Sequence, residues 1–168
     1  NDIEASEWDR LFQINVKSMF LTIKYAMEHL KRSQGSIVNM ASMTGVAGQQ
    51  QNPAYSATKG AVIAMTKALA IDFAPDNVRI NAICPAGVNT PLLEKWLSQQ
   101  PNPEAARKEQ DESHMLGRTA STMEIANVAL FLASDESSFI TGEEIVVDGA
   151  ASLGYGKGPK AEWNNVGK

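Results

Sequence analysis

The sequence contains a single cysteine, Cys84, and only two histidines among its 168 residues. One cysteine excludes an intramolecular disulfide and is typical of proteins from a reducing compartment. Its neighbours are apolar, which favours a packed core thiol over a nucleophile. Because these few soft ligands lie far apart, no zinc-binding spacing is present.

The chain also lacks a run of about 20 apolar residues, which a membrane-spanning helix needs. Its first residues, NDIEASEWDR, are polar and acidic and therefore unlike a signal peptide. The formal charge is −4, and the 15 basic residues are scattered, which argues against nucleic acid and anionic membranes as partners. We expect a soluble, cytoplasmic protein that acts on a small molecule.

Apolar patterning predicts alternating helices and strands. Helices are expected over 6–32 with Ser6 as cap, from Pro53 to Pro75, and from the capping box at 121–124 to residue 133. Strands are expected at SIVNMAS (36–42), VRINAIC (78–84) and EEIVVDG (143–149). This order predicts an α/β fold with a parallel sheet covered by helices. Ligands bind such sheets at the carboxyl ends of the strands, where Ser42, Thr90 and the loop after Cys84 fall.

Tyr55 and Lys59 lie four residues apart in an alanine-rich segment, which places both side chains on one face of a helix. A nearby cation favours the ionised form of a phenol, so the pair could exchange a proton with an alcohol or ketone. The alternative is a packed tyrosine beside a lysine whose stem covers apolar surface. Ser42 ends the preceding strand, and Asn15 lies mid-helix, where asparagine is a poor helix former and could equally be a locally bonded amide.

Several segments together resemble the C-terminal part of a short-chain dehydrogenase/reductase of the common single-domain type. They are WDRLFQINVKSMF, GSIVNMAS, YSATKGAV, VRINAICPAGVNTP and GRTASTMEIANVALFLASDESSFITGEEIVVDG, in the family's order over most of residues 8–149. The resemblance implies a Rossmann-type doubly wound parallel sheet with helices on both faces. Residues 1–151 would be the C-terminal part of that single domain, with a lid at about 91–117, and 152–168 would be a tail.

The resemblance also implies the chemistry. The enzyme would transfer a hydride between NAD or NADP and a secondary alcohol or ketone, with Tyr55 as general acid/base. Lys59 would favour the ionised phenol and bind the nicotinamide ribose. Ser42 would polarise the substrate carbonyl, and Asn15 would fix a water that links Lys59 to solvent. The implied cofactor-binding residues are Tyr55, Lys59, Pro85, Gly87, Val88 and Thr90.

The sequence departs from the family pattern in three places. The usual Pro-Gly is Pro85-Ala86 here, with Gly87 one place later, and the usual Asp-Gly-Gly is 148–150, Asp-Gly-Ala. The family's first half, with its phosphate loop and adenosine site, does not precede these motifs, so we expect a fragment that binds the dinucleotide poorly alone. The alternatives to an enzyme are a non-catalytic binding protein with a dehydrogenase fold or an inactive fragment. The family pattern further implies a homodimer or homotetramer.

Overall fold

The structure is a computed structural model that describes residues 2–153. The described residues fall into two compact units. The first consists of residues 2–84 and 128–146, and the second of residues 85–127 and 147–153. Of the tail expected over 152–168, all but the first two residues lie outside the described part of the chain.

The first unit opens with one continuous helical stretch, as the sequence predicts. It consists of α1 (Ala5–Phe12), a π-helical turn η1 (Gln13–Lys17) and α2 (Ser18–Ser33). The predicted cap is wrong: the N-cap is Glu4, its side chain makes no capping bond, and Ser6 lies inside the first turn. The stretch ends at Gln34, whose left-handed φ of 51° stops the helix before the first strand.

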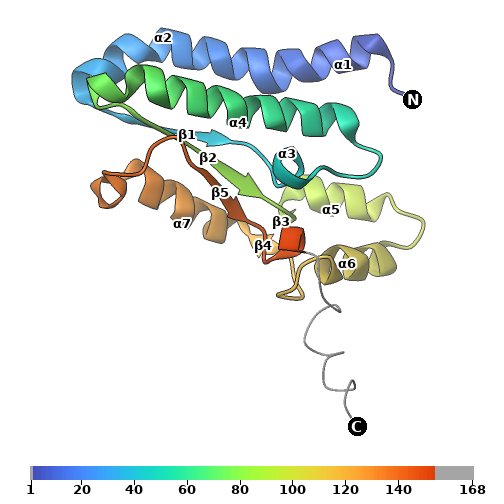
Figure 1. Cartoon of the computed structure of the whole chain (residues 1–168). Helices are drawn as coiled ribbons and strands as arrows, with labels where there is room; N and C mark the ends of the chain where they lie inside the picture. Colours follow the sequence, from blue (N-terminus) through green and yellow to red (C-terminus); the bar gives the residue numbers. More distant parts are fainter. Residues whose placement is uncertain (1, 154–168) are drawn as a thin grey trace. The chain divides into compact units, whose positions relative to one another are not determined.

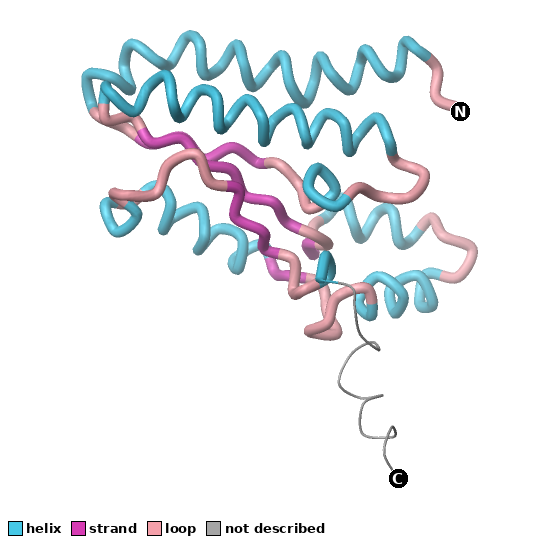
Figure 2. The backbone as a smooth tube through the Cα atoms, in the orientation of Figure 1, coloured by secondary structure: helices cyan, strands magenta, loops and turns pink. Residues whose placement is uncertain are grey.

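The sheet of the first unit has the order β1-β2-β5, with β1 (Ser36–Met40), β2 (Arg79–Pro85) and β5 (Glu144–Val147). Strand β1 pairs in parallel with β2, so that Ser36 faces Arg79 and Met40 faces Ile83. Figure 2 shows these strands in magenta. Strand β2 lies between the other two, which explains why it is buried along nearly its whole length. The parallel sheet predicted from the sequence is confirmed.

Helix α4 (Pro53–Phe73) begins with Pro53 in its first turn and is followed by the short 3-10 helix η2 (Ala74–Asp76), which contains Pro75. Both proline positions agree with the sequence prediction. Between β1 and α4 lies a short helix, α3 (Thr44–Ala47).

Helices α2 and α4 cover one face of the sheet, and their apolar residues form its core with β2 (Figure 1). The buried residues of that core are Ile23, Met27, Ala41, Val62, Ile63, Ala70, Val78, Ile80, Ala82 and Cys84. The end of helix α7 (Thr122–Ala133) lies on the other side of the sheet (Figure 1). Helices on both faces of a parallel sheet are the Rossmann-type arrangement expected above.

Arg79 ties the start of β2 to the end of α7. Its Nη1 donates to the Leu132 carbonyl and to Ser137 Oγ, each at 2.8 Å, and its Nη2 donates to the Ser134 carbonyl at 2.9 Å. A guanidinium suits this place because the last carbonyls of a helix have no intrahelical partner and carry partial negative charge. The 3-10 helix η3 (Asp135–Ser137) follows directly.

The second unit contains the two-residue strands β3 (Val88–Asn89) and β4 (Ala120–Ser121), paired in parallel, and the helices α5 (Pro91–Ser98) and α6 (Pro103–Glu112). Both helices lie in the segment, about 91–117, that the family resemblance assigns to a lid. Pro91 and Pro103 do not break structure but occupy the first turns of the two helices, where proline is well tolerated.

The capping box that opens α7 is confirmed. The Glu124 amide donates to Ser121 Oγ at 3.2 Å, and the Ser121 amide donates to Glu124 Oε2 at 2.8 Å. After β5 the described chain ends in the 3-10 helix η4 (Ala151–Leu153). None of the helices within residues 2–153 combines the length and apolar character needed to cross a membrane.

Candidate active site

Tyr55 and Lys59 occupy successive turns at the start of α4 and share one face, as their spacing predicts. The Lys59 Nζ lies 5.5 Å from the centroid of the Tyr55 ring. It donates a hydrogen bond of 2.9 Å to the carbonyl of Met40 at the end of β1. Burial lowers the pKa of the Lys59 ammonium below its ordinary value of 10.5. The ammonium is thus held beside the phenol by the end of the strand.

The Tyr55 hydroxyl has no hydrogen-bond partner in the described part of the chain. Within residues 2–153, no hydrogen bond joins it to another side chain or to the backbone. Its ring is partly buried, so the aromatic body is fixed by α4 and its surroundings. A positioned phenol with its oxygen uncommitted can give a proton to, or take one from, a bound molecule.

Ser42 lies two residues after β1 and is buried, with 7% of its surface exposed. Its Oγ accepts from the Thr44 amide at 3.2 Å and from Thr44 Oγ1 at 3.1 Å. The Gly45 amide in turn donates to the Ser42 carbonyl at 3.0 Å. These bonds form a tight turn that fixes the direction of the Ser42 side chain.

That turn packs directly on the part of α4 that carries Lys59. A Cβ added at Gly45 would lie 2.6 Å from the Lys59 carbonyl carbon and 2.7 Å from the Gly60 nitrogen. Met40 and Gly45 lie on either side of Ser42 in the sequence, and both contact Lys59. The Met40 carbonyl binds the Lys59 side chain, and Gly45 packs against the Lys59 backbone. Ser42 is brought against the turn of α4 that follows Tyr55.

Asn15 lies in the π-helical turn η1, and its Nδ2 donates to Thr58 Oγ1 at 3.1 Å. Thr58 is fully buried and donates its own proton to the Tyr55 carbonyl at 2.7 Å. The amide is therefore bonded across to α4 rather than within its own helix. π-Helical turns occur frequently at functional sites, and this one places Asn15 beside the residues that precede Lys59.

Sequence reasoning missed both Thr58 and the π-helical turn. A signal for the turn existed, because Asn15 interrupts an otherwise apolar helical face. The partner of Asn15 had no such signal, since the two residues are 43 positions apart.

The remaining predicted site residues, at 85–90, belong to the second unit. Thr90 caps α5, and its Oγ1 accepts from the Leu93 amide at 3.2 Å, which leaves the hydroxyl proton available for donation. The Gly87 amide donates to Nε2 of His114 at 3.0 Å, and the Gly87 carbonyl accepts from the Ala120 amide at 2.9 Å. Val88 opens β3, and Pro85 ends β2. His114 was missed from the sequence.

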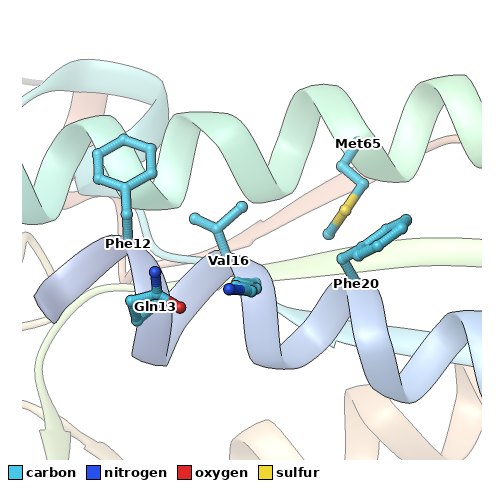
Figure 3. A pocket seen from close by; sticks show the side chains of 6 residues that line it. Phe12, Gln13, Val16, Phe20 and Met65 are labelled. Carbon is cyan, nitrogen blue, oxygen red and sulfur yellow. The ribbon is translucent and has the colours of Figure 1, made fainter. Parts of the chain in front are cut away.

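A shallow groove of about 420 Å³ lies on the first unit. Phe12 and Val16 point toward α4, and Met65 of α4 reaches toward Phe20 (Figure 3). Gln13 and Lys17 complete its lining. The groove contains none of the predicted catalytic residues, and its walls are mostly apolar.

Comparisons with known proteins identify the family of the chain. The family model described as enoyl-(acyl carrier protein) reductase matches residues 1–152. L-fucose dehydrogenase of Bos taurus is 42% identical over 156 residues, which cover 93% of this chain and 57% of that protein. The chain belongs to the short-chain dehydrogenase/reductase family. This dehydrogenase-family chain is also 43% identical to cyclopentanol dehydrogenase of Comamonas testosteroni over 149 residues, or 88% of this chain and 58% of the relative.

A solved structure shares the fold. The solved structure of ElxO with NADP bound matches with a TM-score of 0.83 at 29% identity, over 89% of this chain and 60% of that one. The family assignment made from the sequence motifs is thus confirmed. The dehydrogenase-family chain spans a little over half the length of the curated relatives it matches.

Proposed function

We propose that this protein is an NAD- or NADP-dependent oxidoreductase that interconverts a secondary alcohol and a ketone, with Tyr55 as general acid/base. The observation that carries the proposal is the placement of Lys59. Its ammonium is tethered to the Met40 carbonyl and stands beside a tyrosine whose hydroxyl has no partner among residues 2–153. A packed tyrosine beside a solvated lysine would need neither feature.

In the proposed mechanism, the protein supplies position and a proton. Tyr55 Oη accepts the hydroxyl proton when an alcohol is oxidised and returns it when a ketone is reduced. The charge of Lys59 stabilises the ionised phenol during that exchange. The Ser42 hydroxyl donates a hydrogen bond to the substrate oxygen and keeps its proton, and Asn15 supports the path by which the Tyr55 proton reaches solvent.

The residues present fit a nicotinamide cofactor. The nicotinamide carboxamide would bind a hydroxyl donor and backbone groups, which Thr90 and Val88 provide. The hydroxyls of the nicotinamide ribose would accept hydrogen bonds from the Lys59 ammonium. A Cβ at Gly87 would meet Gln110 Nε2 at 2.5 Å, so the backbone there approaches its neighbours as only glycine permits. We assign Pro85, Gly87, Val88 and Thr90, with Tyr55 and Lys59, to cofactor binding. The bound cofactor would supply or accept the hydride.

The substrates of the relatives suggest where to begin. L-fucose dehydrogenase and cyclopentanol dehydrogenase are named for a sugar and for a cyclic secondary alcohol. We propose a secondary alcohol borne on a ring as the substrate class.

We further propose a homo-oligomer, a dimer or tetramer, because the groove beside Phe20 and the exposed Ile14 and Tyr25 give the α1–α2 stretch an apolar outer surface. A cytoplasmic location stays a prediction from the composition.

The decisive experiment replaces Tyr55 by phenylalanine in the natural full-length protein. We expect Tyr55→Phe to lower kcat by at least about 100-fold for cyclopentanol or L-fucose, because general acid/base groups contribute factors of that order. Cofactor binding, measured by fluorescence titration with NADH and NADPH, should be retained.

Tyr25→Phe is the matched control. Tyr25 also has a lysine near its ring, with Lys24 Nζ 6.0 Å from the centroid, but its side chain is 74% exposed. We expect this variant to keep wild-type turnover. Normal turnover in Tyr55→Phe would remove the acid/base assignment, and a wild-type protein that binds neither cofactor would favour a non-catalytic role.

A further inference from the structure

His114 is a buried histidine whose two ring nitrogens are both hydrogen-bonded. Only 2% of its surface is exposed. Its Nε2 lies 3.0 Å from the Gly87 amide nitrogen, and its Nδ1 lies 2.9 Å from the Gln110 carbonyl oxygen. An amide N–H can only donate, so Nε2 must carry the lone pair and Nδ1 the proton. The contacts therefore select the neutral tautomer with hydrogen on Nδ1.

The ring packs against the backbone that it binds. A Cβ added at Gly87 would lie 2.9 Å from His114 Cε1 and 3.0 Å from Thr119 Cγ2. Any residue larger than glycine would push the ring away from this position. This contact gives a physical reason for the position of the glycine in Pro85-Ala86-Gly87, one place later than the family pattern.

The peptide of Gly87 is held on both sides. His114 accepts its N–H, and the Ala120 amide donates to its carbonyl at 2.9 Å. The segment that supplies this second contact is itself fixed, because the Thr119 amide donates to Asp111 Oδ1 at 2.9 Å. The last turn of α6 and the residues after it thus form the support of the loop at 87–90.

We propose that His114 is a positioning residue that fixes the backbone of the cofactor-binding loop at 87–90 through the Gly87 amide. The inference rests on the proposed function, in which Val88 and Thr90 of this loop hold the nicotinamide carboxamide. Without an acceptor on the ring, the Gly87 N–H would lose its partner, and the loop would sample other positions. Cofactor affinity would fall, although His114 itself does not touch the cofactor.

The test compares two variants of the natural full-length protein. His114→Phe keeps an aromatic ring but removes the acceptor, and the ring borders a cavity of about 80 Å³ that can take up small shifts. His114→Gln places an amide oxygen near the position of Nε2 and retains an acceptor. The exposed His29, which contacts Arg32 at 2.8 Å, gives a control variant, His29→Phe.

The first readout is hydrogen exchange of the peptide that contains Gly87. We expect at least about tenfold faster exchange of its amide in His114→Phe, since one hydrogen bond to a buried donor is lost. Exchange in His114→Gln and His29→Phe should stay within about threefold of the wild type. Unchanged exchange in a folded His114→Phe, or equal acceleration in both His114 variants, would overturn the proposal.

The second readout separates binding from chemistry. We expect the KM for the cofactor to rise about tenfold in His114→Phe, with kcat and the KM for the alcohol changed less, and to recover in His114→Gln. Equal loss in kcat for both variants would contradict a positioning role. If the wild-type protein binds no dinucleotide, the proposed function fails, and the exchange measurement alone decides whether His114 holds this loop.

Discussion

The ammonium group of Lys59 is bonded to the Met40 carbonyl at 2.9 Å while it stands 5.5 Å from the centre of the Tyr55 ring. Helix α4 presents both side chains, and β1 supplies the carbonyl that holds one of them. The lysine is thereby directed by an element other than its own helix. The position of the Lys59 charge beside the phenol is therefore set by this hydrogen bond and not by packing of the lysine side chain.

Replacing Lys59 by methionine should therefore abolish catalysis without unfolding the protein. We expect turnover to fall by about 100-fold or more, because the ionised phenol loses the neighbouring charge that stabilises it during proton exchange. Burial lowers the pKa of Lys59, so the charged form costs folding free energy and its removal should change the urea midpoint little. Normal turnover in Lys59→Met would contradict the assigned role.

Two buried threonines of α4 make the same kind of contact and allow a matched comparison. Thr58 accepts from Asn15 Nδ2 at 3.1 Å, and Thr66 accepts from Asn39 Nδ2 at 2.9 Å. We expect Thr58→Val and Thr66→Val each to lower the free energy of unfolding by about 1–3 kcal/mol, because each leaves a side-chain amide without its partner, partly buried at Asn15 and buried at Asn39. Chemical denaturation measures this loss.

Only the first of these variants should also affect turnover. Thr58 contacts Asn15 and the Tyr55 carbonyl, whereas Thr66 bonds the Val62 carbonyl, two turns further along the helix. Equal kcat values for the two variants, measured at a temperature where both are folded, would show that the Asn15 contact is purely structural.

A glycine pair tests how closely the Ser42 turn must pack on α4. A Cβ at Gly45 would lie 2.6 Å from the Lys59 carbonyl carbon, whereas a Cβ at Gly60 would meet only the Gly45 carbonyl oxygen at 3.6 Å. We expect Gly45→Ala to destabilise by roughly 1–3 kcal/mol and to lower turnover, because backbone must move. Gly60→Ala should be neutral or about 1 kcal/mol stabilising, since alanine is the better helix former. Thermal unfolding of both variants tests this difference. Equal shifts of their unfolding temperatures would contradict the close packing inferred at Gly45.

The start of α7 should lose stability in acid. Arg118 lowers the pKa of Glu124 from 4.5 to about 2, with further help from Ser121. A depressed carboxyl pKa stabilises the fold above the unfolded value and loses that effect as pH falls through the folded value. The free energy of unfolding of the wild type should therefore exceed that of Glu124→Gln above about pH 4.5, and the difference should close toward pH 2.

Salt provides the control for that prediction. The group is exposed, so its interactions are screened by ions. We expect the difference between wild type and Glu124→Gln to shrink in concentrated salt at pH 6. A difference that stays constant from pH 6 to pH 2 would show that the carboxylate charge plays no part.

The sequence could predict those parts of the structure that depend on nearby residues. The capping box at Ser121 and Glu124, the start of α4 at Pro53 and the shared face of Tyr55 and Lys59 all follow from spacings of a few residues. The strands were recognised for a related reason, since buried parallel strands are short apolar runs. The prolines at 91 and 103 are ambiguous in the sequence, because proline both ends helices and begins them.

Long-range pairings could not be predicted. Asn15 and Thr58 are 43 positions apart, and Gly87 and His114 are 27 apart. Periodicity carries no information about which buried donor meets which acceptor across such distances. The catalytic candidates were therefore found by motif, while the residues that hold them in place were visible only in three dimensions.

The paired threonines of α4 have one more consequence. Thr58 and Thr66 are eight residues apart, so their side chains leave the helix in directions that differ by about 80°. Anchors on two sides prevent the helix from rolling about its axis. The exposed residues Ala64, Ala68 and Ile71 do not help to fix the rotation of α4. Residues on this exposed side can therefore be substituted, for instance to fit a different partner, without changing the orientation of Tyr55.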